Sequence, residues 1–232
     1  MEALVRWLHP VRGLVPPTEF VALAEQHELM GPLTRWVLAA AIRQAADWER
    51  QGIDLVMGVN VSAAHLATGS LLADVADALA AADLPAARLQ LELTEGTVAK
   101  EPDLAAEQFA RLRVLGVEIC IDDFGSGLSS LSRLVNIPAG LLKIDRSLVA
   151  GAGTGRSQAA AAIAAVVGLG RACGMRSLAE GVETADQLAL AEELGCTFAQ
   201  GFHIARPMPA EELERWMSVW RRTRHLSVSV QA

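Results

Sequence analysis

Several short apolar runs in this 232-residue chain finish in a residue that carries charge or an amide. A buried strand gains nothing from a polar residue at its end unless several strand ends meet in one place. The intervals between these residues are 32, 30, 21, 37 and 20 positions, and each leaves room for a helix that returns to the next strand. This rhythm predicts an α/β chain folded as a TIM-like (β/α)8 barrel. The residues are Asn60, Glu92, Asp122 with its neighbour Asp123, Lys143, Glu180 and Gln200.

The spacing of apolar residues also predicts the individual elements. Helical spacing runs from Pro17 to Arg50, where Gly31-Pro32 is expected to separate two helices. Further strands are predicted over 55–61, 88–93, 117–121, 141–144, 177–179 and 197–199, and further helices over 70–82, 101–115, 157–173, 185–194 and 210–220. We therefore predict one domain over residues 1–220 and a polar C-terminal tail over 221–232.

Composition narrows the classes of partner. With 52% hydrophobic residues, 20% charged residues and a net charge of −7, the chain lacks the basic clusters that nucleic acid polymers or acidic membranes require. The longest apolar stretch, Ala159 to Gly170, is too short for a membrane segment. The cysteines Cys120, Cys173 and Cys196 have neither pairing nor metal spacing, so free thiols and a cytoplasmic location are expected.

The polar residues at the strand ends have the chemistry of a site for hard cations. Asn60, Glu92 and Asp122 offer oxygen ligands, and Asp123 and Glu180 could complete a second site that shares Asp122. Two Mg²⁺ or Mn²⁺ ions would then form a template for in-line attack on a phosphodiester. Zinc is disfavoured because the five histidines are scattered and none ends a strand of this set.

Each of these residues also has a structural explanation. Lys143 could help to activate a water molecule, or it could simply neutralise its acidic neighbours. Any single polar strand end could be capped or solvated, but six together favour a site. The glycine-rich segment from Asp123 to Ser130 is predicted to be a functional lid or clamp. The segment from Gly151 to Gly155 lacks the lysine of a phosphate loop and is interpreted as a linker.

Seven ordered motifs resemble the EAL domain family of cyclic di-GMP phosphodiesterases, from Glu2 to about Arg215. The resemblance implies hydrolysis of cyclic di-GMP to linear pGpG with two Mg²⁺ or Mn²⁺ ions. The motifs are Glu2-Ala3-Leu4-Val5-Arg6-Trp7, Val59-Asn60-Val61-Ser62, Leu91-Glu92-Leu93-Thr94-Glu95, Asp122-Asp123-Phe124-Gly125-Ser126-Gly127, Lys143-Ile144-Asp145, Ala179-Glu180-Gly181-Val182-Glu183 and Gln200-Gly201-Phe202.

The resemblance also implies a role for each matching residue. It implies that one metal is held by Glu2, Asn60, Glu92 and Asp122, and the other by Asp122, Asp123 and Glu180. Lys143 and Glu180 are expected to act in the catalytic step, with Lys143 next to the attacking water. Arg6 matches a phosphate contact and Gln200 a residue of the nucleotide pocket. Support of the loop and site is expected from Glu95, Asp145 and Glu183.

The resemblance is incomplete at the N-terminus, where family domains usually begin some twenty residues earlier with a helix and a first strand. We therefore expect the first strand of this chain to have an unpaired edge. We also expect the chain to be less stable and to self-associate through that edge, for example as a homodimer. An alternative function is a catalytically silent module that binds cyclic di-GMP or a partner protein. A third is a phosphohydrolase for another small phosphodiester.

Overall fold

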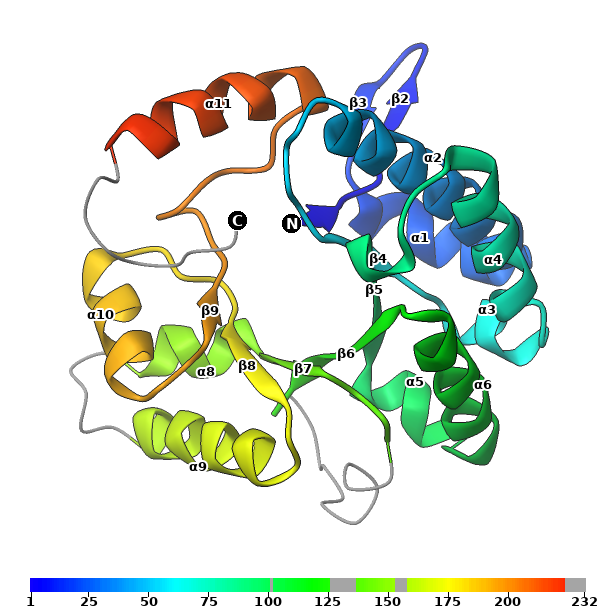
Figure 1. Cartoon of the computed structure of the whole chain (residues 1–232). Helices are drawn as coiled ribbons and strands as arrows, with labels where there is room; N and C mark the ends of the chain where they lie inside the picture. The colour runs from blue at the N-terminus through cyan, green and yellow to red at the C-terminus, as the bar shows by residue number, and fades with distance from the viewer. Residues whose placement is uncertain (101, 126–136, 153–157, 224–232) are drawn as a thin grey trace. The chain divides into compact units, whose positions relative to one another are not determined.

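A computed structural model describes residues 1–100, 102–125, 137–152 and 158–223 of the chain. The chain forms two compact units, residues 1–142 and 143–232, and is mixed α/β as predicted. The first unit contains β1 (Glu2–Ala3), β2 (Trp7–His9), β3 (Gly13–Val15), α1 (Pro17–Gln26), α2 (Met30–Arg50), β4 (Met57–Asn60), α3 (Ala63–Ala67), α4 (Leu71–Ala82), a 3-10 helix (Ala86–Arg88), β5 (Leu89–Thr94), α5 (Glu95–Lys100), α6 (Pro102–Leu115) and β6 (Glu118–Phe124). After β7 (Leu141–Ile144), which crosses the boundary, come α8 (Arg146–Gly151), α9 (Gln158–Ala172), β8 (Arg176–Ala179), α10 (Ala185–Glu193), β9 (Phe198–Ala199) and α11 (Ala210–Thr223) (Figure 1).

The strands form two sheets. Seven of them follow the order β1-β4-β5-β6-β7-β8-β9, whereas β2 and β3 form a separate antiparallel pair. The pairs β1–β4, β4–β5, β5–β6 and β8–β9 are parallel. Consecutive parallel strands need helical crossovers, which the predicted intervals provide.

The alternation along β5 explains how the first unit builds its core. Leu89, Leu91 and Leu93 alternate with polar residues, and all three are fully buried. Side chains of one strand point alternately to the two faces of a sheet, so one face of β5 is apolar and the other carries Gln90 and Glu92. Helices α2, α4 and α6 bury apolar residues beside these strands, among them Leu38, Val75 and Phe109 (Figure 1).

The first two helices divide earlier than predicted. The chain leaves helical geometry around Glu28, whose φ is +56°, and α2 already begins at Met30. Pro32 therefore lies in the first turn of α2, where its missing N–H removes no intrahelical hydrogen bond. The prediction of two helices is confirmed, but Gly31-Pro32 opens the second helix instead of separating the two.

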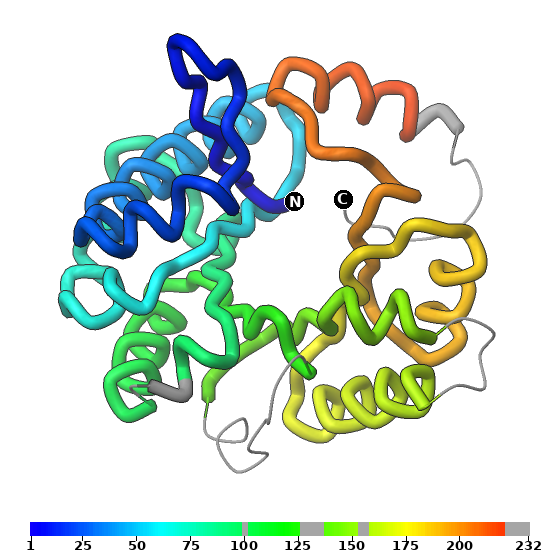
Figure 2. Tube along the Cα trace, turned by 180° about the vertical axis from the view of Figure 1, so that it is seen from behind, coloured from blue at the N-terminus to red at the C-terminus, as the bar shows by residue number. Residues whose placement is uncertain are grey.

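The sequence pattern did not predict the β2–β3 hairpin, whose tip projects beyond α1 and α2 of the same unit (Figure 2). Trp7 packs edge-on against Phe20, with ring centroids 6.0 Å apart. Leu8 and Leu14 are paired across the two strands, yet they are 78% and 65% exposed. Val11, at the turn, is 87% exposed. The outer face of the hairpin is therefore apolar and open to solvent.

The second unit has its own apolar cluster. Ile144, Val149 and Val182 are among its buried residues, and the alanine-rich α9 contributes Ala160 and Ile163 to the same cluster. Helix α11 ends at Thr223, three residues beyond the predicted end, so the first residues assigned to the polar tail are helical. Residues 224–232 lie outside the described part of the chain.

The cysteines are free thiols in the structure. Cys120 is buried, whereas Cys173 and Cys196 are half-buried. Burial raises the pKa of the Cys196 thiol to about 11, against the opposing effect of a hydrogen bond with Ser177. Within the ranges that the structure describes, no helix combines the length and apolarity needed to cross a membrane.

Candidate active site

Three neighbouring strands of the first unit place polar side chains on the same face of the sheet. Asn60 of β4 is the register partner of Glu92 of β5, and Glu92 is the partner of Cys120 of β6. Asp122 lies two residues beyond Cys120 and therefore points to the same face. The register thus brings Asn60, Glu92 and Asp122 to one face of adjacent parallel strands, as the sequence predicted.

The strands extend further than predicted around two of these residues. Glu92 and Asp122 are each followed by two more residues of their strands, so neither is a strand end. Both are almost completely buried, with 3% and 7% of their surface exposed. A buried carboxylate needs charged or hydrogen-bonding partners, which a cation could provide.

Glu2 joins this face through β1. It is the register partner of Gly58, two residues before Asn60, and the Asn60 Nδ2 donates a hydrogen bond of 2.7 Å to the Glu2 Oε1. Gly58 also matters for this face, although the pattern of polar residues does not point to it. A Cβ atom at Gly58 would lie 2.0 Å from the Glu92 Oε1, so the glycine provides room for the Glu92 carboxylate.

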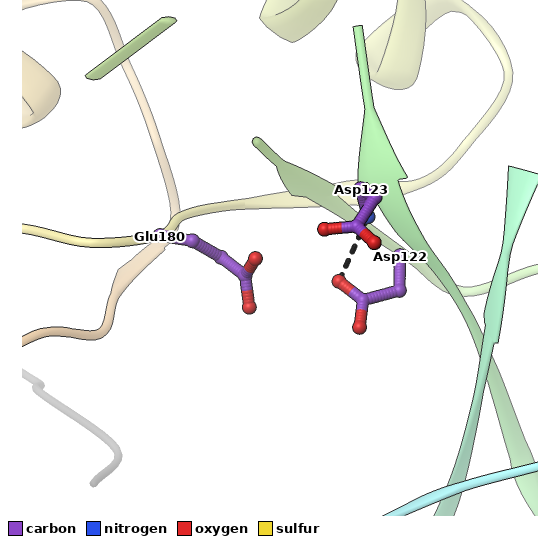
Figure 3. Close-up of side chains that lie close together, drawn as sticks. All are labelled: Asp122, Asp123 and Glu180. Carbon is purple, nitrogen blue, oxygen red and sulfur yellow. Dashed lines mark hydrogen bonds between the residues drawn. The ribbon is translucent and has the colours of Figure 1, made fainter. Parts of the chain in front are cut away.

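Asp123 adopts an unusual backbone conformation beside Asp122. Its φ is +55°, in the left-handed region that non-glycine residues seldom occupy, although aspartate tolerates it better than most. Its backbone N–H donates to the Asp122 Oδ1 at 2.8 Å, which is the dashed line in Figure 3. Strained conformations of this kind are concentrated at functional sites. Glu180, also drawn in Figure 3, belongs to the second unit.

The second unit contains a buried ion pair at the ends of its strands. The Lys143 Nζ lies 2.6 Å from the Glu180 Oε1, and Lys143 is only 1% exposed. Glu180 directly follows β8, and its backbone N–H donates to the carbonyl of Ile144 in β7. The main chain therefore fixes the base of the Glu180 side chain next to the strand that carries Lys143. Such a pair can hold or move a proton at the Lys143 Nζ.

Three further predicted residues belong to the second unit, namely Asp145, Glu183 and Gln200. Gln200 directly follows β9, and its backbone N–H donates to the carbonyl of Ala179. Asp145 caps α8, because its side chain accepts a hydrogen bond from the backbone N–H of Ser147. Glu183 is exposed, and its own N–H donates to the side chain of Gln187. Asp145 thus fixes the start of α8, and the supporting roles of Asp145 and Glu183 stay predictions.

Two predictions concern the borders of the first-unit site. Arg6 lies beyond β1, not on it, and its exposed guanidinium donates to the carbonyl of Val5. Glu95 begins α5 directly after β5. The segment that Glu95 was expected to steady includes residues 126–130, which lie outside the described part of the chain, as do residues 153–155 of the predicted linker.

The donor set of the first unit fits a hard divalent cation. Glu2, Glu92 and Asp122 offer carboxylate oxygens, and the Asn60 amide offers an oxygen because its nitrogen is engaged with Glu2. Carboxylate and amide oxygens are the ligands that Mg²⁺ and Mn²⁺ prefer. The set contains no histidine or cysteine ligand of the kind that zinc favours. By the chemistry of its donors, this set therefore suits the cation that the sequence predicts.

A parallel α/β sheet with carboxylate and amide side chains along one face belongs to the class of folds whose strands present oxygen ligands for divalent cations. The model of the EAL domain matches residues 1–207, and this chain belongs to the EAL domain family. The predicted family is thereby confirmed.

Two curated relatives illustrate the match. The chain is 42% identical over 214 residues to the bifunctional diguanylate cyclase/cyclic di-GMP phosphodiesterase MucR of Pseudomonas aeruginosa, covering 92% of this chain and 31% of MucR. It is 37% identical over 216 residues to the cyclic di-GMP phosphodiesterase PdeR of Escherichia coli, covering 93% of this chain and 32% of PdeR. The chain spans about a third of the length of these relatives.

Solved structures agree with this assignment. A structure of the PaMucR phosphodiesterase in complex with c-di-GMP has a TM-score of 0.86 and 42% identity, covering 91% of this chain and 86% of that one. The FimX EAL domain from Pseudomonas aeruginosa, bound to c-di-GMP, has a TM-score of 0.81 and 27% identity, covering 89% and 82%. The predicted α/β fold of the TIM-like EAL type is confirmed.

Proposed function

We propose that this chain hydrolyses cyclic di-GMP to linear pGpG. The observation that carries the proposal is the alignment of Asn60, Glu92 and Asp122 on one face of three adjacent parallel strands. The buried Lys143–Glu180 pair adds a group suited to proton transfer. Relatives named as cyclic di-GMP phosphodiesterases support the choice of substrate.

The proposed cofactor is a pair of Mg²⁺ or Mn²⁺ ions. Glu2, Asn60, Glu92 and Asp122 would hold one ion, and by the family resemblance Asp123 and Glu180 would contribute to the other together with Asp122. Such ions would supply charge stabilisation at the phosphate and lower the pKa of a bound water.

The protein groups would bind the substrate and handle the proton. In the proposed reaction a water oxygen bonds to one phosphorus, the bond from that phosphorus to the ribose O3′ breaks, and O3′ receives a proton. The Lys143 ammonium would donate a hydrogen bond to the oxygen of the attacking water and so orient it, while Glu180 holds the ammonium in place. Gln200 and Arg6 are the proposed contacts to the dinucleotide.

One assay tests the proposal. The purified chain is incubated with cyclic di-GMP and Mn²⁺, with and without a chelator, and the products are separated by chromatography. We expect pGpG to form with Mn²⁺ alone and not when the chelator has bound the Mn²⁺. Binding of cyclic di-GMP without any product would instead support the silent binding module. Hydrolysis of other small phosphodiesters but not of cyclic di-GMP would overturn the assigned substrate.

A further inference from the structure

The turn that follows β8 is fixed to the strands on both sides of it. On one side, the Glu180 N–H donates to the Ile144 carbonyl at 3.1 Å. On the other, the Val182 N–H donates to the Gln200 carbonyl at 3.0 Å, and the Val182 carbonyl accepts from the N–H of His203 at 2.9 Å. The turn thus has little freedom to shift without breaking backbone hydrogen bonds.

Gly181, at the centre of this turn, lies directly against the start of α8. A Cβ atom at Gly181 would lie 2.6 Å from the Arg146 Cβ and 3.4 Å from the Arg146 Cα. The backbone fixes both Cβ atoms, so no rotamer of Arg146 would relieve the collision. Gly181 also has φ +69°, in the left-handed region that glycine adopts without steric cost. Space and backbone conformation both require glycine here.

Gly201 closes the other side of the turn. A Cβ atom at Gly201 would lie 2.2 Å from the carbonyl oxygen of Val182 and 2.3 Å from its nitrogen. The turn is therefore packed between Arg146 and Gly201, and a displacement from Arg146 would press it toward the segment that follows β9.

We propose that Gly181 is a positioning residue for the reaction, which seats the turn against Arg146 and so holds the Glu180 carboxylate on the Lys143 Nζ. The Glu180 N–H is hydrogen-bonded to the carbonyl of Ile144, two residues before Arg146, so pushing the turn away from Arg146 strains the bond that holds Glu180 beside the strand of Lys143. Apolar carbons pack at about 4 Å, so a Cβ at position 181 would open the contact by about 1 Å. A misplacement of that size can cost about 10²-fold in rate.

The inference rests on the proposed phosphodiesterase function, and its first test compares two glycine variants. Gly174→Ala is the matched control, because Gly174 has φ +74° but no atom within 4 Å of an added Cβ. Both variants therefore carry the same backbone strain, and only Gly181→Ala adds the collision. We expect kcat for cyclic di-GMP to fall about 10²-fold further in Gly181→Ala than in Gly174→Ala, with KM changed by less than about threefold. Equal kcat values would overturn the inference.

A rescue experiment separates positioning from general destabilisation. Arg146→Gly removes the Cβ that Gly181→Ala would strike, whereas Arg146→Ala keeps it. In the Gly181→Ala background, Arg146→Gly should recover most of the loss in kcat, and Arg146→Ala should recover none. Equal recovery by the two substitutions would overturn the inference. If Gly181→Ala alone does not fold, the comparison of the two double variants decides the question.

A structural measurement keeps this inference distinct from the proposed function. Crystal structures of the wild type and of the Gly181→Ala/Arg146→Ala and Gly181→Ala/Arg146→Gly variants give the distance between the Lys143 Nζ and the Glu180 Oε1, which is 2.6 Å here. We expect this distance to exceed hydrogen-bond range with Arg146→Ala and to be restored with Arg146→Gly. An unchanged distance would overturn the inference, whereas a wild type without turnover would overturn only the proposed function.

Discussion

Lys143 places an ammonium group in a nearly solvent-free position, 2.6 Å from a carboxylate of Glu180. Lys143→Met keeps most of the side-chain volume and removes the charge. Because a group that orients water acts on the chemical step, turnover of cyclic di-GMP should fall by about 10²–10⁴ while its binding changes little. Single-turnover rates and calorimetric binding measure the two effects separately. Arg171→Met, at an exposed position of α9, is the control, and a proportional loss of binding would make Lys143 a substrate contact instead.

Glu92 is the most enclosed carboxylate of the proposed metal centre. Glu92→Gln preserves its shape and removes one negative charge from the cation's ligands. We expect Mn²⁺ affinity to fall at least about tenfold and turnover to be lost with it, because the remaining oxygens compensate poorly for a missing charged ligand. Mn²⁺ titration calorimetry checks this, with Glu107→Gln on the exposed face of α6 as the control. Unchanged Mn²⁺ affinity in Glu92→Gln would place the metal elsewhere.

Individual residues also show where sequence reasoning stops. Asn60, Glu92 and Asp122 were predictable because they interrupt apolar strands at helical crossover intervals. Gly58 and Gly181 were not, because their importance depends on what a missing Cβ would strike, and those neighbours come from other elements. Arg6 belongs to the same motif as Glu2, but β1 contains only Glu2 and Ala3, so Arg6 lies beyond the strand.

At the scale of the secondary-structure elements, a polar pair of side chains links helices α3 and α4. The fully buried His65 of α3 contacts Asp74 of α4 at 2.7 Å, and Ser70 donates to the same carboxylate. Burial raises the pKa of Asp74, but the hydrogen bonds from His65 and Ser70 and the nearby charges outweigh it and hold this pKa below its usual 3.8. The ionised carboxylate therefore stabilises the fold above pH 3.8, and this contribution disappears as the pH falls through the lower folded-state pKa.

Asp74→Asn tests this link. It should lower the free energy of unfolding at pH 7 by about 1–3 kcal/mol, because the buried imidazole of His65 loses a charged partner. The difference from the wild type should shrink as the pH drops below 3.8. Urea unfolding at several pH values measures both effects. Asp77→Asn, exposed one turn further along α4, should change little, and a pH-independent difference would contradict the explanation.

Elements with a sustained pattern were predicted closely, and short ones were not. The alternation of leucine with polar residues located β5 to within one residue at each end. The strands of the β2–β3 hairpin have three residues each, and α3, α5 and α8 have five or six. Elements this short contain fewer than two turns of a helix, or little more than one repeat of the strand alternation. Tertiary contacts rather than the local hydrophobic pattern therefore determine whether they form.

The choice of cation affects the activity of the whole molecule. Mg²⁺ and Mn²⁺ favour compact octahedral coordination, whereas Ca²⁺ accepts more ligands at longer distances. We therefore expect turnover with Mg²⁺ or Mn²⁺ and inhibition when Ca²⁺ is added. Initial rates at fixed Mn²⁺ and rising Ca²⁺ check this, with Na⁺ at equal ionic strength as the control. Equal turnover in Ca²⁺ and Mg²⁺ would contradict the proposed paired-cation geometry.

At the scale of the chain, the order of strands and crossovers was predictable from intervals between polar residues. The division into two compact units was not, since the apolar pattern continues through Leu141 to Ile144 at their junction. The single domain over 1–220 and the homodimer stay predictions.

The solvent-facing side of the β2–β3 hairpin has a practical consequence for handling the protein. Leu8, Val11 and Leu14 present an apolar surface that water wets poorly. The chain should therefore be retained on a phenyl chromatography resin at high ammonium sulfate and elute as the salt is lowered. Leu8→Thr with Leu14→Thr keeps residues suited to strands and should shorten that retention, providing a preparation better suited to concentrated samples.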